Sequence, residues 1–167
     1  APIAEYPEIQ FSLKMRLGWE NASECMVLVE LLNTLRLSRI ALHARTGKQQ
    51  YKGHPDLEAF QGFYELCQHP LYYNGDIESL SDIRQILTRF PLLKGVFIGR
   101  GLLSSPLLAK EFKGNETFLP EQRMSIYFAF HEELFSAYSQ VLQGETQLLV
   151  KMKTLWEYFL PETDRKL

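Results

Sequence analysis

Two short stretches of the sequence carry basic side chains at the same spacing. Lys14 and Arg16 lie in "KMRLG", and His43 and Arg45 lie in "HARTG". Because alternate side chains of a β-strand point to the same face, each pair is expected to project from one side of its strand. Ammonium, imidazolium and guanidinium groups bind phosphate and carboxylate oxygens. The shared spacing therefore predicts an anion-binding site to which two strands contribute.

Each pair also has a simpler interpretation. Lys14 and Arg16 are compatible with an exposed strand end whose long side chains reach into water, and a single histidine such as His43 is more often a hydrogen-bonded core residue. The repetition of the i, i+2 pattern in a second strand argues against this interpretation. We therefore expect a functional site here.

The elements that must position these side chains follow a repeated plan from residue 8 to about residue 105. Short runs rich in β-branched and aromatic residues alternate with helical patterns, and Gly18, Gly47, Gly75 and Gly101 recur 29, 28 and 26 residues apart. Strands that alternate with helices form βα units around a parallel sheet. Each unit is as long as one step of a TIM barrel, in which eight steps take on the order of 250 residues. Residues 1–105 are thus predicted to form four βα units of a half TIM-type barrel.

Residues 106–167 are predicted to form a small all-α domain. Pro120 suits the first turn of a helix that closes at Gly144, and the next helical pattern stops at Pro161. The stretch "FKGNETFLP" is the expected linker. The predicted fold class is α/β, with a partial TIM-type (β/α) barrel followed by this helical domain.

Polar residues also follow the third and fourth predicted strands. Asn74, Gly75 and Asp76 lie in "YYNGD", and Gly99 and Arg100 lie in "IGRG". In TIM-type barrels the carboxyl ends of the strands form the active face, and the loops after the last two strands commonly bind phosphate. An Asn-Gly pair alone signals only a turn, and a Gly-Arg-Gly is weaker still. The order of the motifs favours a phosphate site.

The composition restricts the classes of partner. The formal charge of -2 and a pI near 6.1 exclude a generally basic nucleic-acid coat, although a local patch remains compatible with them. No apolar stretch is long enough to span a membrane. Cys25 and Cys67 lack metal-ligand spacing, so we expect two small buried residues, no metal, and a reducing, cytoplasmic setting. A start at Ala-Pro rather than Met is compatible with a piece of a longer protein.

Two features of the helical part are expected to serve packing rather than chemistry. His131 is expected to pack or lie at the surface. The aromatic residues of the first helix are expected to form a core, with nucleic-acid stacking as the alternative, and they are Tyr127, Phe128, Phe130, Phe135 and Tyr138.

Four motifs, "KMRLG", "HARTGKQQYKG", "YYNGDI" and "GVFIGRGLLSSP", together resemble the second half of the tRNA-dihydrouridine synthases. These are flavin enzymes built as a TIM barrel followed by a helical RNA-binding domain, and they reduce uridine in tRNA with FMN and NADPH. The resemblance implies that Lys14 and His43 contact FMN and that Arg16 and Arg45 border the uridine. The residues that it implies for the FMN phosphate are Asn74, Gly75, Asp76, Gly99 and Arg100.

The catalytic cysteine of that family lies in an Asn-x-Gly-Cys-Pro motif on the first half of the barrel. No stretch of this sequence matches the motif. The resemblance therefore implies a fragment without the catalytic half, and we expect this chain alone to be inactive.

The loop after the second strand also carries Lys48 and Lys52, which we expect at RNA phosphates. Two other hypotheses remain open: a non-catalytic RNA-binding or interaction module derived from this family, and a different phosphate-binding barrel enzyme. A half barrel also leaves unpaired sheet edges, which predicts self-association.

Overall fold

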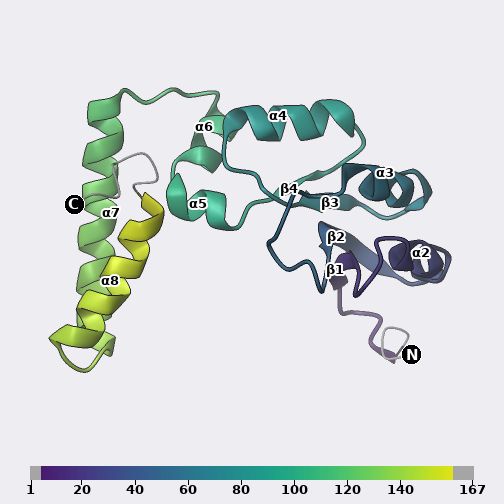
Figure 1. Cartoon of the computed structure of the whole chain (residues 1–167), viewed down its shortest axis with the longest axis horizontal. Coiled ribbons are helices and arrows are strands. Elements are labelled where there is room, and N and C mark those ends of the chain that lie inside the picture. Colours follow the sequence, from purple (N-terminus) through teal and green to yellow (C-terminus); the bar gives the residue numbers. More distant parts are fainter. Residues whose placement is uncertain (1–4, 160–167) are drawn as a thin grey trace. The chain divides into compact units, whose positions relative to one another are not determined.

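The computed structural model describes residues 5–159 (Figure 1). The chain divides into two compact units. The first, here called the sheet unit, runs up to Ile77 and includes Ser81–Ile98. The second, here called the helical unit, comprises Glu78–Leu80 and continues from Gly99.

The sheet unit contains one four-stranded parallel sheet with the strand order β1-β2-β3-β4. Its strands are β1 (Phe11–Gly18), β2 (Leu37–Thr46), β3 (Leu71–Asn74) and β4 (Gly95–Phe97). The helices that alternate with them are α2 (Glu24–Thr34), α3 (Leu57–Leu66) and α4 (Leu80–Arg89). Four parallel strands in sequential order confirm the predicted partial TIM-type architecture.

The core of the sheet unit lies between the strands and the helices α2, α3 and α4. Phe60 of α3 contacts both Tyr73 and Phe90 edge-on, with ring centroids 5.0 Å apart in each case. The β2 strand is buried from Ile40 to Arg45, because it lies between β1 and β3 and α3 covers one of its faces. The β1 strand lies at the edge of the sheet; its first half alternates between partly buried and exposed residues, and Leu17 near its end is fully buried. The inner strand thus provides most of the strand residues in the core, and the edge strand contributes Leu17.

The helical unit contains four helices: α5 (Arg100–Ser104), α6 (Leu108–Gly114), α7 (Pro120–Val141) and α8 (Glu145–Phe159). As predicted, Pro120 occupies the first turn of α7. The side chain of Gln122 accepts a hydrogen bond from the backbone N–H of Leu119 at 2.9 Å, which closes the start of this helix. The predicted linker is shorter than expected, because its first residues belong to α6 and the helix ends only at Gly114. Pro161 lies outside the described residues.

The interpretation of the α7 aromatic residues as a core is wrong, because α7 contains no buried residue. Phe128 and Phe135 are exposed, and the other three are partly buried. Within the helical unit α7 packs against α8, so a single helix covers only part of its apolar surface. His131 lies in this contact, 5.3 Å from the ring of Trp156, as expected of a packing residue.

Among the described residues, none of the helices has both the length and the apolar character that crossing a membrane requires. The same part of the chain brings together no group of three or more His, Cys, Asp or Glu side chains suited to a metal ion.

Candidate functional site

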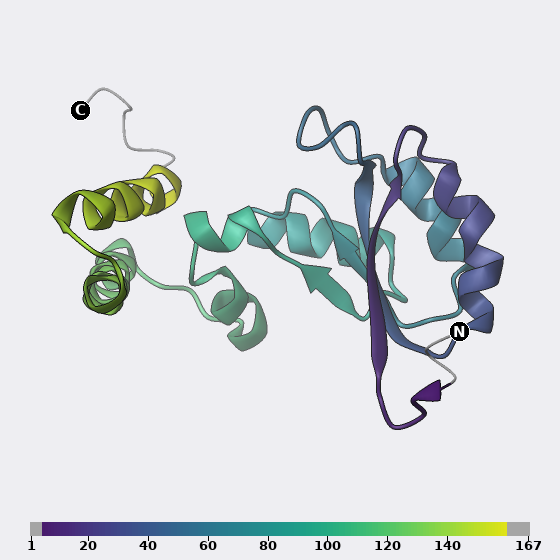
Figure 2. The same cartoon turned by 90° about the horizontal axis from the view of Figure 1, so that it is seen from below.

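The parallel register places three predicted site residues in one row across the sheet. Arg16 of β1 pairs with His43 of β2, and His43 pairs with Asn74 of β3. All three lie at the carboxyl ends of their strands. Figure 2 shows the loops after β1 and β2 leaving the sheet at the same end. The structure thus brings together residues that lie up to 58 positions apart in the sequence.

His43 is a neutral imidazole at physiological pH. Burial, followed by the charges of Arg16, Arg45 and Lys14, lowers its pKa to about 4. The residue is 6% exposed, and its Nε2 atom lies 3.5 Å from a terminal nitrogen of Arg45. A neutral ring can donate through one nitrogen and accept through the other. His43 is therefore suited to hydrogen bonding with a polar ring rather than to acting as a cation.

Arg45 is buried inside the sheet unit and joins the loops after β2 and β3 through hydrogen bonds. It is 1% exposed, and its two terminal nitrogens donate to the two carboxylate oxygens of Asp76, with one of these contacts at 2.7 Å. The guanidinium also donates to the backbone oxygen of Gly53 at 2.7 Å. This arrangement joins the loop after β2 to the loop after β3. The remaining nitrogen, Nε, is buried and has no hydrogen-bond partner among residues 5–159.

Arg16 holds the loop after β2 from the edge strand. Its Nη1 atom donates to the backbone oxygens of Thr46 at 2.8 Å and Gln50 at 3.0 Å. The guanidinium carbon also lies 5.7 Å from the centre of the Tyr51 ring. Arg16 therefore positions this loop in addition to lying in the row.

The lysines of the predicted site are exposed. Lys14 projects from β1 and pairs in register with Ala41, one alternation before Arg16. Lys48 forms an ion pair with Glu20, and both side chains are 57% exposed. Lys52 lies at the surface of the same loop. These ammonium groups are accessible to an anion from solvent.

The loop after β3 has an unusual backbone. Gly75 has φ of 147°, and Asp76 has φ of 35°, a left-handed conformation that is uncommon for residues other than glycine. The Asn74 side chain donates to the backbone oxygen of Phe97 at 2.8 Å, so β3 and β4 are also joined at their carboxyl ends. Gly99 and Arg100 begin the helical unit, where Gly99 precedes α5 and Arg100 is its first residue.

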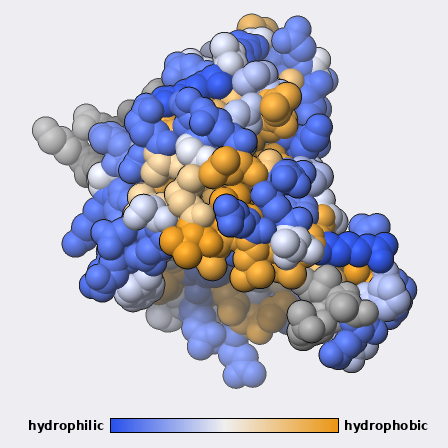
Figure 3. Space-filling model, turned by 90° about the vertical axis from the view of Figure 1, so that its right-hand side faces the viewer, coloured by the Kyte–Doolittle hydropathy of each residue, from blue (hydrophilic) through white to orange (hydrophobic). Residues whose placement is uncertain are grey.

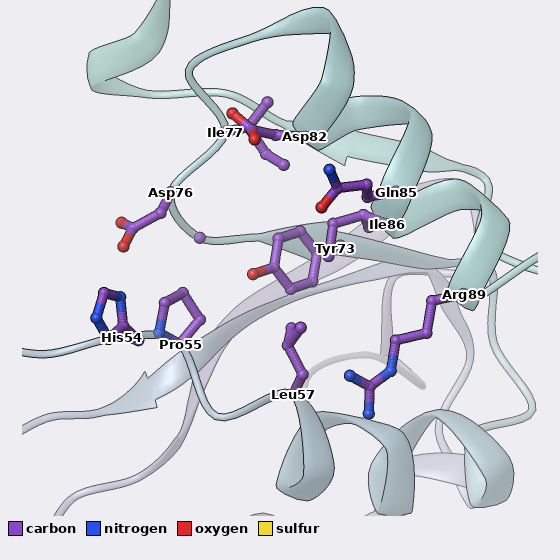
Figure 4. A pocket seen from close by; sticks show the side chains of 11 residues that line it. His54, Pro55, Leu57, Tyr73, Asp76, Ile77, Asp82, Gln85, Ile86 and Arg89 are labelled. Carbon is purple, nitrogen blue, oxygen red and sulfur yellow. The ribbon is translucent and has the colours of Figure 1, made fainter.

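A cavity that the sequence did not predict lies next to the loop after β3 (Figure 4). Its volume is about 360 Å³, and residues from α3, α4 and the loops before them line it. Tyr73 points its hydroxyl toward the side of the cavity where Asp76 lies. Burial, followed by the charge of Asp76, raises the pKa of this hydroxyl. Since side chains alternate along β3, Tyr73 and Asn74 lie on opposite faces of the sheet.

The two cysteines lie outside the row. Cys25 is buried in the first turn of α2, and its thiol donates to the backbone oxygen of Ala22 at 3.2 Å. Cys67 follows α3 and is partly exposed, so the prediction of a buried residue holds only for Cys25. Burial raises the pKa of both thiols.

Comparison with known proteins gives a consistent result. The model of the dihydrouridine synthase (Dus) family matches residues 4–163. The chain is 36% identical over 105 residues to a probable tRNA-dihydrouridine synthase from Aquifex aeolicus, covering 63% of this chain and 33% of that protein. It is 35% identical over 100 residues to a probable tRNA-dihydrouridine synthase from Rhizobium leguminosarum, covering 59% of this chain and 31% of that protein.

A third relative is the tRNA-dihydrouridine(16) synthase of Escherichia coli. It is 28% identical over 110 residues, which cover 65% of this chain and 35% of that protein. The chain thus spans about a third of the length of these curated relatives.

Proposed function

The chain belongs to the dihydrouridine synthase family, and from this premise we propose that it forms the flavin- and tRNA-binding part of an enzyme that reduces uridine to dihydrouridine in tRNA. The observation that carries the proposal is the row of Arg16, His43 and Asn74 at the carboxyl edge of a parallel sheet. Basic and amide groups in this position fit a phosphorylated ring cofactor.

The residues present fit FMN by their chemistry. Lys14 offers an exposed ammonium group and His43 a neutral imidazole, which suits hydrogen bonding to the polar edge of a flavin. The residues proposed for the phosphate, by the family resemblance, are Asn74, Gly75, Asp76, Gly99 and Arg100. When bound, FMN supplies the hydride for the uracil double bond, and NADPH is the proposed source of electrons.

The same edge is proposed to receive the RNA. Arg16 and Arg45 would border the uridine, and Lys48 and Lys52 would contact phosphates. Arg16 and Arg45 also hold the surrounding loops, so their contribution to the uridine pocket is partly to keep its wall in place. The helical domain, residues 106–167, is proposed to bind tRNA, in the cytoplasm where the substrate is found.

FMN titration tests the cofactor site. Charge-assisted hydrogen bonds to the phosphate contribute roughly 1.5 to 3 kcal/mol each. The apolar cover for the ring would come from strands outside this chain, so we expect a Kd at the micromolar level or weaker, equivalent to about 8 kcal/mol. Arg100→Ala should abolish this binding, and Cys67→Ala serves as the control that should not change it. Tight binding, or binding indifferent to Arg100, would show that the flavin is placed wrongly.

A second candidate is a non-catalytic RNA-binding or interaction module. It is favoured by the position of both cysteines outside the row, each with a raised thiol pKa. Mass spectrometry of tRNA incubated with the chain, FMN and NADPH tests the choice. We expect tRNA binding without dihydrouridine formation by the chain alone, and dihydrouridine formation would contradict that expectation.

We also propose that the chain self-associates. Among the described strands, the edge strand β1 pairs on one side only. Figure 3 shows a group of apolar side chains on the side of the molecule where α2 and α3 lie. Exposed on these helices are Val27, Leu28, Leu31 and Leu66. Unpaired strand edges and apolar patches both favour association. Light scattering that shows a stable monomer at high concentration would contradict this proposal.

A further inference from the structure

Trp19 is a large aromatic residue that the structure leaves at the surface next to the candidate site. It follows β1 in the sequence "RLGWEN", and 65% of it is exposed. None of the roles assigned above involves this residue. A tryptophan at the surface is uncommon enough to require an explanation, because burial of its ring would stabilise the fold.

The backbone that carries Trp19 is fixed. The carboxylate of Glu24 accepts hydrogen bonds from the backbone N–H groups of Trp19 at 2.8 Å, Glu20 at 2.9 Å and Asn21 at 2.7 Å. These bonds lower the pKa of Glu24, so the carboxylate keeps its charge and its acceptors. The exposed indole is thus attached to a turn whose backbone is held by hydrogen bonds.

The loop after β2 supports the indole from one side. The backbone N–H of Gly47 donates to Gly18 at 2.7 Å, and that of Lys48 donates to Trp19 at 2.9 Å, which extends the β1–β2 pairing beyond the strands. A Cβ atom on Gly47 would lie 2.3 Å from the Cε3 atom of the indole. The ring therefore occupies space that any other residue at position 47 would fill, and the rest of the ring faces solvent.

A lysine follows Gly47, and its backbone N–H, not its ammonium group, is what contacts Trp19. Lys48 pairs with Glu20, and both groups are largely exposed. An ion pair of this kind contributes little to stability, so the lysine can exchange the carboxylate for a phosphate at small cost. Glu24 stays hydrogen bonded to three backbone N–H groups, and the exposed Glu20 carboxylate that the exchange releases is screened by water and salt.

Proteins bind unpaired nucleotides by combining exposed aromatic rings with basic side chains, since every base has a π-face that can stack. We propose that Trp19 is a stacking subsite for an unpaired base of the RNA substrate, with Lys48 at an adjacent phosphate. This inference rests on the proposed tRNA substrate and adds a contact outside the row of Arg16, His43 and Asn74. The occupant is a nucleotide other than the reacting uridine.

Intrinsic fluorescence tests the subsite directly. The chain contains two tryptophans, so Trp156→Phe leaves Trp19 as the single emitting indole. Titration of this variant with an unmodified tRNA transcript at low salt should quench its emission, because stacking on a base brings the indole into contact with it. Nitrocellulose filter binding on the same samples measures the affinity independently of fluorescence.

Three variants separate stacking from general surface effects. Trp19→Ala should weaken binding of the transcript roughly tenfold, the effect of one stacked base, and Trp19→Phe should retain most of the affinity. Gly47→Ala keeps the tryptophan but displaces its ring, and should weaken binding as Trp19→Ala does. Leu92→Ala is the matched control, an exposed apolar residue before the amino end of β4 that should not alter binding. Circular dichroism confirms that each variant is folded.

The outcomes distinguish this inference from the proposed function. If the transcript binds without quenching, and Trp19→Ala binds as tightly as the parent, the subsite is wrong and the tRNA substrate stands. If the transcript does not bind to the parent chain at all, both the subsite and the proposed tRNA-binding role are overturned.

Discussion

The strands β1 and β2 carry the same i, i+2 pattern of basic residues, and the structure uses the two patterns differently. On β1, Lys14 is exposed and Arg16 is partly buried. On β2, His43 and Arg45 are both buried. The difference follows from position, because β1 lies at the edge of the sheet and β2 lies between two strands. The spacing determines which face a side chain takes, and the neighbouring strands determine whether it meets solvent.

This difference divides the site into two parts. We call Arg45 and Arg16, which hold the loops, the frame, and the exposed Lys14 the contact surface. Arg45 holds the loops after β2 and β3 from inside, and Arg16 holds the first of these loops from the edge. Lys14 is exposed and, within the part of the chain that the structure describes, forms no hydrogen bond or ion pair, so its ammonium is accessible. The variants below test this division, in order of their expected effect on the stability of the sheet unit. Trp19 fluorescence in the Trp156→Phe background reports on that unit alone.

The largest effect is expected at Arg45. Arg45→Ala removes the guanidinium that pairs with the Asp76 carboxylate and donates to Gly53, and should lower the free energy of unfolding by about 3 kcal/mol. Arg45→Lys keeps the charge but cannot form the two-pronged contact, so it should restore only part of the loss. Urea unfolding measures both. If Arg45→Ala lowers the free energy of unfolding by less than about 1 kcal/mol, the hydrogen bonds of Arg45 do not stabilise the fold.

Adding Asp76→Asn to Arg45→Ala sharpens the result. The second change removes the charge of the carboxylate that has lost Arg45, so the double variant should be more stable than the sum of the two single losses predicts. Simple additivity would mean that the two side chains do not act as a pair.

The next effect is a dependence on pH at His43. The folded protein holds the His43 pKa at about 4, below the usual value of 6.5. Between these values the unfolded chain binds a proton that the folded chain does not, so the stability contributed by the neutral ring is full above pH 6.5 and is lost as the pH falls toward 4. The total is up to about 3 kcal/mol.

Urea unfolding between pH 4.5 and pH 8 checks this dependence. His43→Asn should reduce the change in the free energy of unfolding between pH 4.5 and pH 8, because the other titrating groups affect both proteins equally. Equal slopes in the two proteins would contradict the burial of a neutral imidazole.

Arg16 is expected to have a smaller effect because it lies on the edge strand. Arg16→Ala removes hydrogen bonds to the backbone oxygens of Thr46 and Gln50, and should lower the free energy of unfolding by about 1 to 2 kcal/mol. Arg39→Ala is the matched control, an exposed arginine on β2 that should change stability by less than about 0.5 kcal/mol. Faster amide exchange at residues 47–52 in Arg16→Ala alone would confirm that the loop is released. Unchanged exchange would argue against it.

Much of this arrangement could be predicted from the sequence. The alternation of strand and helix patterns predicted the parallel sheet, and the position of Pro120 predicted the start of α7. The i, i+2 spacing predicted which side chains share a face. These features depend on local periodicity and on the chemistry of single residues, which a sequence contains.

The remaining features depend on residues that are distant in the sequence. The Arg45–Asp76 pair joins positions 31 residues apart, and the position of the Trp19 ring depends on the absence of a side chain at Gly47. The exposure of the α7 aromatic residues depends on how much of α7 is covered by α8. An amphipathic pattern indicates an apolar face without indicating how completely it is covered. No local signal in the sequence would have identified these partners.

The smallest effect on stability is expected at Lys14, and this makes the residue the sharpest test of the division between frame and contact surface. Because Lys14 is exposed, Lys14→Ala should change the free energy of unfolding by less than about 0.5 kcal/mol. If the ammonium contacts FMN as proposed, the same change should weaken FMN binding roughly tenfold, the equivalent of one charge-assisted hydrogen bond. Arg39→Ala again serves as the control, with neither property altered. If Lys14→Ala loses both stability and FMN binding, Lys14 belongs to the frame. If it retains both, Lys14 does not belong to the flavin site. Fluorescence titration and urea unfolding must therefore be measured on the same preparations.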